Sequence, residues 1–288
     1  MTGKLYLTAT PIGNLGDITH RAAEVLGKVD LVACEDTRHT RKLLSHLGIQ
    51  ARTVSYHAHN EAARTAELIA MLEEGRSIAV VSDAGTPGIA DPGMTVVREA
   101  IARGIEVVPV PGAAAFVAAA VASGLPAAPM FFEGFLPARQ GERRRRLAEL
   151  AGIPATLVFY EAPHRLARSL ADCAEVLGDR EAAVARELTK LHEEFVRGRL
   201  AELARRFADG TKGEIVVVVG APEPEAVRPA DEKKSVATRV EELLAEGMDR
   251  RAAMKQAARE YGLSRSEVYR EVEAGKAANA AKGNREKD

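Results

Sequence analysis

The sequence has only two cysteines and lacks the common phosphate-binding loops. Cys34 and Cys173 lie far apart, and neither belongs to a Cys-x-x-Cys pair, so neither a disulfide framework nor a zinc knuckle is expected. The chain contains neither Gly-x-x-x-x-Gly-Lys-Ser/Thr nor Gly-x-Gly-x-x-Gly behind a strand, the glycine-rich motifs that hold nucleotide phosphates. The amino terminus, MTGKLYLTATPIGNLGD, also lacks the profile of a secretory signal peptide. We therefore expect a protein of the reducing cytoplasm.

An excess of charge of either sign is also missing. The 288 residues carry a formal net charge of −1, which excludes a nucleic-acid binder that is basic throughout. One local cluster remains, because residues 139–146, RQGERRRR, hold five arginines against one glutamate. The long uncharged run over residues 107–132 is rich in alanine and contains four prolines. It predicts a strand end, a turn and a short buried helix rather than a membrane span.

The first 125 residues alternate short apolar runs with helical patterns. The runs are too apolar to alternate between buried and exposed positions, which is typical of strands that are covered on both faces. Most of the intervening helical patterns end at a glycine, and the first begins at Asp17 or Thr19 as the N-cap. This order predicts a parallel sheet with helices on both sides. The predicted strands are residues 5–10, 30–35, 51–57, 77–82 and 105–110.

In residues 126–222 the strand and helix patterns no longer alternate regularly, which predicts a second, mixed α/β lobe. Two consecutive strands flank residues 190–192, which indicates a hairpin and therefore at least one antiparallel pair. The predicted strands are residues 131–135, 156–161, 181–189, 193–198 and 213–220, with helices over 141–151, 164–177 and 199–208.

Residues 223–288 predict a linker and a helical extension. Residues 221–234 are rich in proline and acid, and three helical patterns follow over residues 236–247, 249–262 and 264–275. The last two have the shape of a helix-turn-helix, with Gly262 in the turn and Ser264 as a cap. From Arg228 onward there are 14 Lys and Arg against 12 Asp and Glu, so charge alone gives little support for nucleic-acid binding. The predicted domains are residues 1–125, 126–222 and 223–288.

The carboxyl ends of the five predicted strands of the first lobe are rich in glycine, proline or polar side chains. Ligands of open α/β sheets bind outside these ends, so one rim of the sheet is a predicted site. The loop SDAGTPGIADPG, residues 82–93, offers the carboxylate of Asp83, the bare backbone of Ala84 and Gly85, and a path fixed by prolines. Such a loop suits a polar ligand that is not a phosphate. The other exits are residues 10–14, 35–38, 57–61 and 109–113.

Each exit also has a structural interpretation. Residues 35–38 can cap a helix, and residues 111–115 can simply allow close packing of a helix on the sheet. His57 and His59 have the spacing of a metal pair, but no cysteine or third ligand is nearby in the sequence, so a metal is not expected.

Several motifs together resemble a known family. TATPIGNLGDIT, EDTRHTRKLL, HNE, SDAGTPGIADPG, VPVPGAAA, EGFLPA, FYEAPHRL, RELTK and KGE occur in this order between residues 3 and 220. The sequence thereby resembles the ribosomal RNA small subunit methyltransferase I family, of the tetrapyrrole-methylase-like class of S-adenosylmethionine enzymes. The helical extension resembles that of the same family through weaker motifs.

The resemblance implies a two-lobed α/β fold, a homodimer and S-adenosylmethionine bound between the lobes. It also implies methylation of the ribose 2′-hydroxyl of a decoding-centre cytidine in 16S rRNA, within the 30S subunit. Residues 182–187 and 213–215 are expected to close over the adenosine. By the family pattern the cofactor-binding residues are Pro11, Gly13, Asp83, Ala84, Gly85, Pro111, Gly112, Ala113, Ala114, Phe159, Tyr160, Glu161 and Glu187.

The resemblance names no general base, so the reactive residues are inferred from their chemistry. Methyl transfer from a sulfonium depends mainly on positioning, and a base can assist because a ribose hydroxyl is a poor acid. The expected catalytic residues are Glu35, Asp36 and Arg38, with His57 and Asn60 as second candidates. The expected RNA contacts are Arg139, Arg143, Arg144, Arg145, Arg146 and Lys190, although a charge run of this kind is often only a solvated helix face.

Two other functions compete with this interpretation. A methylase of small tetrapyrrole intermediates would share the scaffold, but would have little use for an arginine cluster or a helical extension. A ligand sensor that binds DNA through the extension would need a more basic helix than SRSEVYREVE. No DNA and no membrane are expected as partners.

Overall fold

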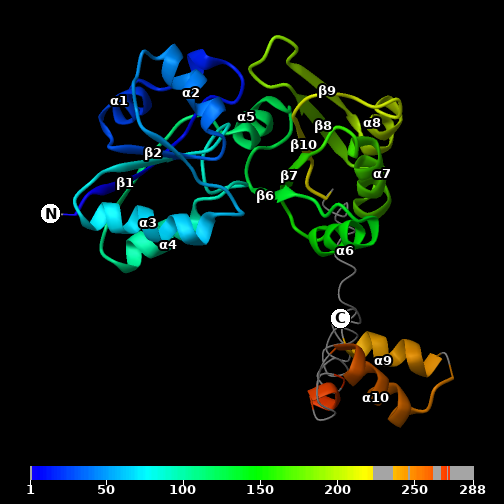
Figure 1. The fold of residues 1–288 in the computed structure, drawn as a ribbon. Coiled ribbons are helices and arrows are strands. Elements are labelled where there is room, and N and C mark those ends of the chain that lie inside the picture. Colours follow the sequence, from blue (N-terminus) through cyan, green and yellow to red (C-terminus); the bar gives the residue numbers. More distant parts are fainter. Residues whose placement is uncertain (1, 223–235, 246, 262–266, 271, 273–288) are drawn as a thin grey trace, which may run out of the picture. The chain divides into compact units, whose positions relative to one another are not determined.

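The computed structural model describes residues 2–222, 236–245, 247–261, 267–270 and 272 of the chain. Residues up to Pro222 form one compact unit with two α/β lobes, each built on a five-stranded sheet, and helices lie in a second unit beyond it (Figure 1). No helix in these ranges is long and apolar enough to cross a bilayer. The predicted α/β fold class is confirmed.

The first sheet is parallel throughout, as predicted. Its order is β3-β2-β4-β1-β5, so the fourth strand lies in the middle and the first strand lies between it and the edge strand β5. Each strand is shorter than its predicted range, because residues at one or both of its ends lie outside the sheet. The strands are β1 (Lys4–Thr8), β2 (Leu31–Cys34), β3 (Thr53–Ser55), β4 (Ile78–Val81) and β5 (Glu106–Val110).

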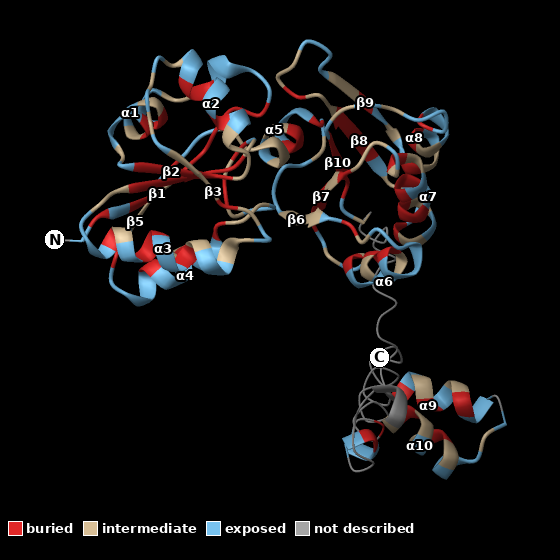
Figure 2. Cartoon of the chain, in the orientation of Figure 1, coloured by how far each residue is buried: buried red, intermediate tan, exposed pale blue. Residues whose placement is uncertain are grey.

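Two pairs of helices cover the first sheet. Helices α1 (His20–Lys28) and α2 (Thr37–His46) cover one face, and α3 (Glu61–Glu73) and α4 (Met94–Ala102) cover the other (Figures 1 and 2). Of the two predicted caps of α1, Thr19 is the one used: its Oγ1 accepts from the backbone N–H of Ala22 at 3.1 Å. Both faces of the sheet are thereby buried, which explains why its strands are continuous apolar runs.

The second sheet is mixed, as the hairpin predicted. Its order is β6-β7-β10-β8-β9, and only the β6–β7 pair is parallel. One face packs on α6 (Gln140–Leu150), α7 (Leu166–Leu177) and α8 (Leu200–Arg206) around a large apolar core. The strands are β6 (Met130–Phe135), β7 (Thr156–Glu161), β8 (Glu181–Arg186), β9 (Glu194–Arg199) and β10 (Ile215–Val219).

The alanine-rich helix connects the two lobes. Helix α5 (Ala115–Ala122) follows the last strand of the first sheet but packs on the other face of the second sheet. Its Ala119 and Ala120 are buried against Val158 and Val218. Small side chains let this helix approach the sheet closely, and this packing holds the start of α5 at the junction between the lobes (Figure 1).

An ion-pair network joins α6 to α7. The carboxylate of Asp172 is buried and accepts from Arg143 Nε at 2.9 Å, Arg144 Nε at 2.7 Å and Gln140 Nε2 at 2.9 Å. Burial alone would raise the pKa of Asp172, but these hydrogen bonds outweigh it and hold the pKa below its usual range. Arg143 also donates to the backbone carbonyls of residues 137 and 138, so its buried guanidinium is well satisfied.

The second unit contains α9 (Val236–Ala245) and α10 (Arg250–Tyr261), which pack around a small apolar core. Val240, Leu243, Ala253 and Ala257 are fully buried there, and Val268 belongs to the same core. The predicted linker lies mostly outside the described residues, as do the turn at Gly262 and the cap at Ser264.

Removing the buried carboxylate should destabilise the first unit strongly. We expect Asp172→Ala to lower the free energy of unfolding by about 3–5 kcal/mol, because it leaves the Arg143 guanidinium buried without its counter-charge. Urea unfolding followed by circular dichroism measures this loss. Glu142→Ala is the matched control, since it removes only an exposed pair with Arg139 and should change stability by less than about 1 kcal/mol. Equal effects of the two substitutions would contradict the assignment.

Candidate functional site

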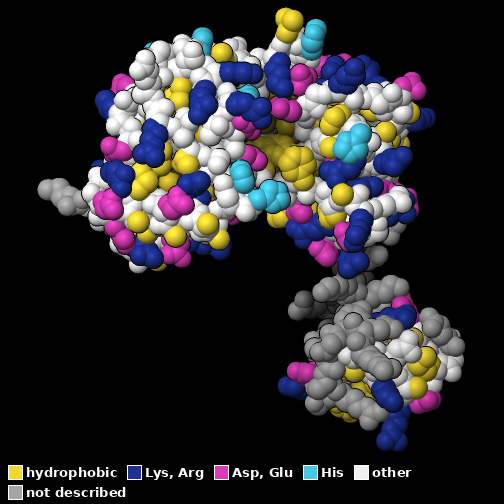
Figure 3. Space-filling view, in the orientation of Figure 1, with side chains coloured by type: hydrophobic (Ala, Val, Ile, Leu, Met, Phe, Trp, Pro, Cys, Tyr) yellow, Lys and Arg dark blue, Asp and Glu magenta, His cyan; other side chains and the backbone are white. Residues whose placement is uncertain are grey.

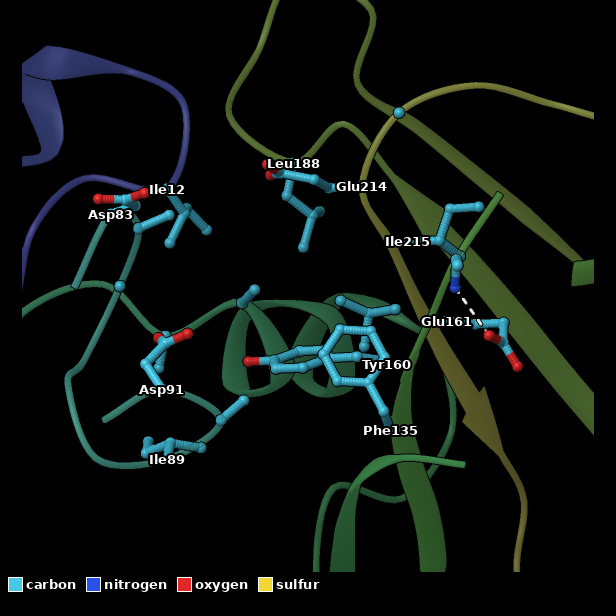
Figure 4. A pocket seen from close by; sticks show the side chains of 18 of the residues that line it. Ile12, Asp83, Ile89, Asp91, Phe135, Tyr160, Glu161, Leu188, Glu214 and Ile215 are labelled. Atoms are coloured by element: carbon cyan, nitrogen blue, oxygen red, sulfur yellow. Dashed lines mark hydrogen bonds between the residues drawn. The ribbon is translucent and has the colours of Figure 1, made fainter. Parts of the chain in front are cut away.

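A hollow of about 410 Å³ lies where the carboxyl ends of β1, β4 and β5 meet the second lobe (Figure 4). This is the rim that the strand exits predicted. Most of its wall is apolar or backbone, and polar side chains are few. The first lobe contributes Ile12, residues 83–86 and 89–91, Ala114 and Ala115; the second contributes Phe135, residues 160–163, Leu188 and residues 213–216.

The loop after β4 is hydrogen-bonded to the segments that follow β1 and β5. The N–H of Thr10 donates to the carbonyl of Gly85 at 2.9 Å, and the N–H of Gly85 donates back to Thr10 at 3.1 Å. Thr86 Oγ1 donates to the carbonyl of Ala113 at 3.2 Å, which ties the loop to the segment after β5. Gly85 has φ +82°, and a Cβ there would lie 3.3 Å from a methyl carbon of Ile12. The position therefore requires glycine and leaves bare backbone facing the hollow.

Three carboxylates gather beside this loop. Asp83 Oδ1 accepts from the backbone N–H of Asp36 at 3.0 Å, whereas the described residues provide no hydrogen bond or ion pair to the side chain of Asp91 or Glu35. Burial raises the pKa of Asp91, and the charge of Asp83 raises it further. Burial also raises the pKa of Glu35, with contributions from Asp91 and Asp83. This side of the hollow is thus negative and suits a ligand with a positive centre.

Aromatic rings form the opposite side of the hollow. Tyr160 meets Phe135 edge-on with ring centroids 5.4 Å apart, and meets Phe132 in the same way at 5.1 Å. Phe132 in turn stacks on Phe116 of α5 at 4.2 Å. Burial raises the pKa of the Tyr160 phenol, and the charge of Asp91 adds to the shift. Figure 4 shows Asp83 and Asp91 across the hollow from Tyr160.

The connection between β8 and β9, residues 187–193, bridges the two lobes. Thr189 Oγ1 accepts from the N–H of Asn14 at 3.0 Å, and Glu187 Oε1 accepts from the N–H of Glu214 at 2.9 Å. Glu187 Oε1 also accepts from Lys190 Nζ at 2.9 Å, and this bond is the main reason that the pKa of Glu187 is lowered. Both Glu187 and Thr189 adopt left-handed backbone conformations, with φ of 51° and 65°. These contacts hold the connection in a strained, defined path.

A second hollow of about 230 Å³ lies beside the first. Ile12, Asp83, Ala84 and Glu214 line both hollows, so the two share a wall. The remaining lining residues come from the exits of β1 and β4, from α2 and from the bridging connection: Thr10, Pro11, Gly13, Leu15, His39, Thr40, Leu43, Ser82 and Lys190.

The expected cofactor residues fall into three groups. Asp83, Ala84, Gly85, Ala114, Tyr160 and Glu161 line the larger hollow, and Pro11 and Gly13 line the smaller one. Pro111, Gly112, Ala113 and Glu187 line neither hollow: Pro111 and Gly112 are exposed, Ala113 accepts from Thr86, and Glu187 holds Lys190 and the backbone of Glu214. Phe159 is 1% exposed and belongs to the core on the far face of the second sheet, which removes it from the lining residues.

The carboxylate of Glu161 is committed to the protein itself. It accepts from Arg165 and from the hydroxyl of Ser169, and it has no exposed side-chain surface. Glu161 therefore shapes the wall through its backbone and leaves no free charge toward a ligand.

None of the five expected catalytic side chains is among the residues that line the two hollows. Asp36 is the N-cap of α2 and accepts from the N–H of Arg38 at 2.7 Å. Asn60 accepts from the N–H of His57 at 2.9 Å and donates to Ser55, so it fixes the turn before α3. Arg38 is exposed to solvent, and only Glu35 lies close to the acidic side of the larger hollow.

The histidine pair forms no metal site within the ranges that the structure describes. His57 and His59 meet edge-on at 5.9 Å, and the buried Nδ1 of His57 has no hydrogen-bond partner. No cluster of three or more His, Cys, Asp or Glu side chains in these ranges has the arrangement of a metal site.

The arginines of α6 are largely neutralised. Arg143 is buried against Asp172, so its expected RNA contact does not fit the structure. Arg144 pairs with Asp172 and Glu175, Arg146 pairs with Glu133 and Glu149, and Arg139 pairs with Glu142. Arg145 is exposed, and Lys190 is held between Glu187 and Glu214 at 2.9 and 3.1 Å.

Some lining residues were missed at the sequence level. Asp91 lies in the loop of residues 82–93, and its position as the second acid of SDAGTPGIADPG was a usable signal. His39 was hidden within the helix after β2, and Leu188 within the hairpin, where nothing in the sequence indicates that they face a cavity.

Comparison with known proteins identifies the relatives of this fold. Residues 4–204 match the family described as Tetrapyrrole (Corrin/Porphyrin) Methylases. A "Ribosomal RNA small subunit methyltransferase I" from Micromonospora olivasterospora is 49% identical over 94% of this chain and 87% of its own. One from Synechocystis sp. is 48% identical over 93% and 96%. A structure of uroporphyrin-III C-methyltransferase from Thermus thermophilus, complexed with S-adenosyl homocysteine, has a TM-score of 0.55 at 22% identity over 79% of this chain and 100% of its own.

A side chain at position 13 should displace the bridging connection. A Cβ on Gly13 would lie 2.5 Å from Lys190 Cγ, 2.8 Å from Thr189 Oγ1 and 2.9 Å from the carbonyl of Leu188. We expect Gly13→Ala to destabilise the chain by about 1–3 kcal/mol and to speed proteolytic cleavage within residues 187–193. Gly152→Ala, where a Cβ meets open space, is the control. An unchanged cleavage rate in Gly13→Ala would show that the connection does not depend on this contact.

Proposed function

Because the chain belongs to the tetrapyrrole methylase family, and within it to the ribosomal RNA small subunit methyltransferase I family, we propose that it methylates 16S rRNA. The methyl donor is S-adenosylmethionine, and the acceptor is the ribose 2′-hydroxyl of a cytidine. The observation that carries the proposal is the larger hollow, which joins a negative side, an aromatic side and bare backbone at the rim of the sheet.

The residues of the larger hollow fit the proposed donor. S-adenosylmethionine supplies a methyl group on a positively charged sulfur. Asp83 and Asp91 give the hollow a negative side that favours such a charge, and no cation among the described residues pairs with Asp91. Gly85 exposes its backbone to the ligand, and the segment Gly213–Val216 offers further backbone beside Tyr160. The hollow lies within the size range of about 300–1,000 Å³ that is usual for small-molecule sites.

Positioning is the main task of these residues. The loop after β4 is fixed by its bonds to Thr10 and Ala113, and the second lobe is held by the contacts of residues 187–190. A fixed donor and a fixed hydroxyl convert the transfer into an effectively unimolecular step, which needs no covalent intermediate. The shared wall at Ile12, Asp83 and Ala84 supports an acceptor seated beside the donor.

Asp91 is the best-placed proton acceptor on the protein. Its carboxylate lines the larger hollow without a hydrogen bond from the described residues, and its raised pKa makes it a stronger base than an ordinary aspartate. Glu35 is the second candidate, because burial and the neighbouring acids also raise its pKa. Asp36 caps α2, Asn60 fixes the turn before α3, and Arg38 is better suited to hold an RNA phosphate.

The proposal also covers the cellular location, the form of the substrate and the oligomeric state. We place the reaction in the cytoplasm, on rRNA within the 30S subunit, and expect a homodimer. A methylase of tetrapyrroles is the competing function, because the same fold occurs in uroporphyrin-III C-methyltransferase. The 48–49% identity over most of the chain favours rRNA.

Methyl transfer should distinguish the two substrates. We expect purified protein with labelled S-adenosylmethionine to label 30S subunits that lack the modification, because their rRNA presents the cytidine hydroxyl beside the donor at the wall that the two hollows share. Naked 16S rRNA and a tetrapyrrole precursor are assayed beside them, and labelled rRNA is mapped to the nucleotide. Label in the tetrapyrrole alone would overturn the proposed acceptor while leaving the donor in place.

Replacing the carboxylate of Asp91 should remove both activity and its dependence on pH. Activity of the wild type should rise with pH as Asp91 loses its proton, at a higher pH than an ordinary aspartate requires. We expect Asp91→Asn to lower kcat roughly 100-fold or more and to abolish this rise. Asp17→Asn, an acid away from the hollows, is the control.

Stability provides an independent check on Asp91. A carboxyl group whose pKa is raised in the folded state stabilises the fold only at low pH, and its ionisation destabilises the fold as the pH rises. Asp91→Asn should therefore be more stable than the wild type at neutral pH, as measured by thermal unfolding. A variant that is less stable and retains the wild-type pH profile would exclude Asp91 as the base.

A further inference from the structure

The outer face of α2 carries an unusual concentration of positive charge. Arg38, Arg41 and Lys42 are all exposed, and His39 and His46 lie on the same helix. The ion pairs of the described residues leave Arg41 and Lys42 without a partner, and Arg38 has only a weak 3.8 Å contact with Asp36. Figure 3 shows dark-blue side chains gathered over this part of the first lobe, next to the central hollow. These charges contribute nothing evident to the stability of the fold.

The arginine cluster of α6 has the opposite character. Arg143, Arg144 and Arg146 are paired with carboxylates of the second lobe, and a paired charge attracts an anion only weakly. The helix with more arginines is thus the weaker candidate for binding a polyanion.

The inner face of α2 forms part of the wall of the smaller hollow. His39, Thr40 and Leu43 line that hollow, which shares Asp83 and Ala84 with the larger one. Its 230 Å³ is below the roughly 300–1,000 Å³ of sites that enclose a whole drug-sized ligand, so it suits one unit of a larger partner. A strand held on the outer face of α2 would present its nucleotides to this hollow.

We propose that α2 is the RNA-docking helix of this protein, with Arg38, Arg41 and Lys42 binding the phosphates that flank the target nucleotide. The inference rests on the proposed function, and it names the surface that function uses. Arginine and lysine contacts to phosphates fix the register of a nucleic acid on a protein, which here means the approach of one ribose to the smaller hollow. Arg38 and Arg41 are three residues apart and Lys42 follows at once, so the three side chains form a short basic strip along the helix.

The salt dependence of RNA binding tests this surface directly. Each phosphate contact adds about 0.7 to the slope of log K against log salt for a single strand. The double variant Arg41→Gln with Lys42→Gln should therefore lower the slope by roughly 1.4 and weaken binding about tenfold or more near 0.1 M salt. Filter binding or fluorescence anisotropy with a fragment of 16S rRNA that contains the target cytidine measures both quantities on the full chain.

A matched double variant separates docking from net charge. Lys28→Gln with Arg76→Gln removes the same charge from the residues that precede β2 and β4, at the opposite edge of the sheet, where both side chains make only surface pairs. Its slope should equal that of the wild type. Binding of S-adenosylmethionine, measured by calorimetry, should be the same in the wild type and both double variants, which shows that the larger hollow is intact.

A wrong function and a wrong docking surface would give different results in these experiments. If the wild type neither binds nor methylates the rRNA fragment or 30S subunits, the proposed function is wrong. If the wild type binds and methylates, but the α2 variant keeps the wild-type slope and affinity, the docking surface is wrong. A loss of the same size in both double variants would also overturn it, because the effect would then reflect net charge alone.

Discussion

The structure of the site depends on the hydrogen bonds between the loop after β4 and the segments that follow β1 and β5. The paired bonds of Thr10 and Gly85 and the bond from Thr86 to Ala113 join three strand exits into one rigid rim. Without them residues 82–93 would be a glycine-rich loop free to move. With them the backbone of Ala84 and Gly85 has one position, opposite the aromatic rings of the second lobe. Helix α5 keeps that lobe in place, since it continues from the first sheet and packs on the second.

Some charged side chains of the described residues are buried in pairs within the fold, whereas others without a partner lie around the two hollows. The guanidinium of Arg143 and the carboxylate of Asp172 are buried together. Either charge would be strongly destabilising in the interior without the other. Asp91 and Arg41 have no such partner among the described residues. Asp91 lines the larger hollow, whereas Arg41 belongs to the helix that walls the smaller one. Unpaired charge of opposite sign thus occurs where a cationic donor and a polyanionic acceptor would meet.

The sequence was sufficient for the fold and for the rim of the site. Alternation of apolar runs and helices determines a parallel sheet, and the carboxyl ends of parallel strands share an edge, so the importance of residues 82–93 could be predicted. The sequence was not sufficient to predict which individual side chains are buried, which are paired and which line a cavity. Arg143 looked exposed because its partner Asp172 is 29 residues away. Phe159 and Tyr160 point to opposite faces of β7, and a strand buried on both faces gives no pattern that tells which one lines a cavity.

A crystal structure of the chain with S-adenosylhomocysteine would test the central claim, that the larger hollow holds the methyl donor beside the acceptor. The account predicts the sulfur between Asp91 and Tyr160, the adenosine against residues 213–216, and the smaller hollow open toward α2. Density for the ligand in the smaller hollow, or outside both, would contradict it.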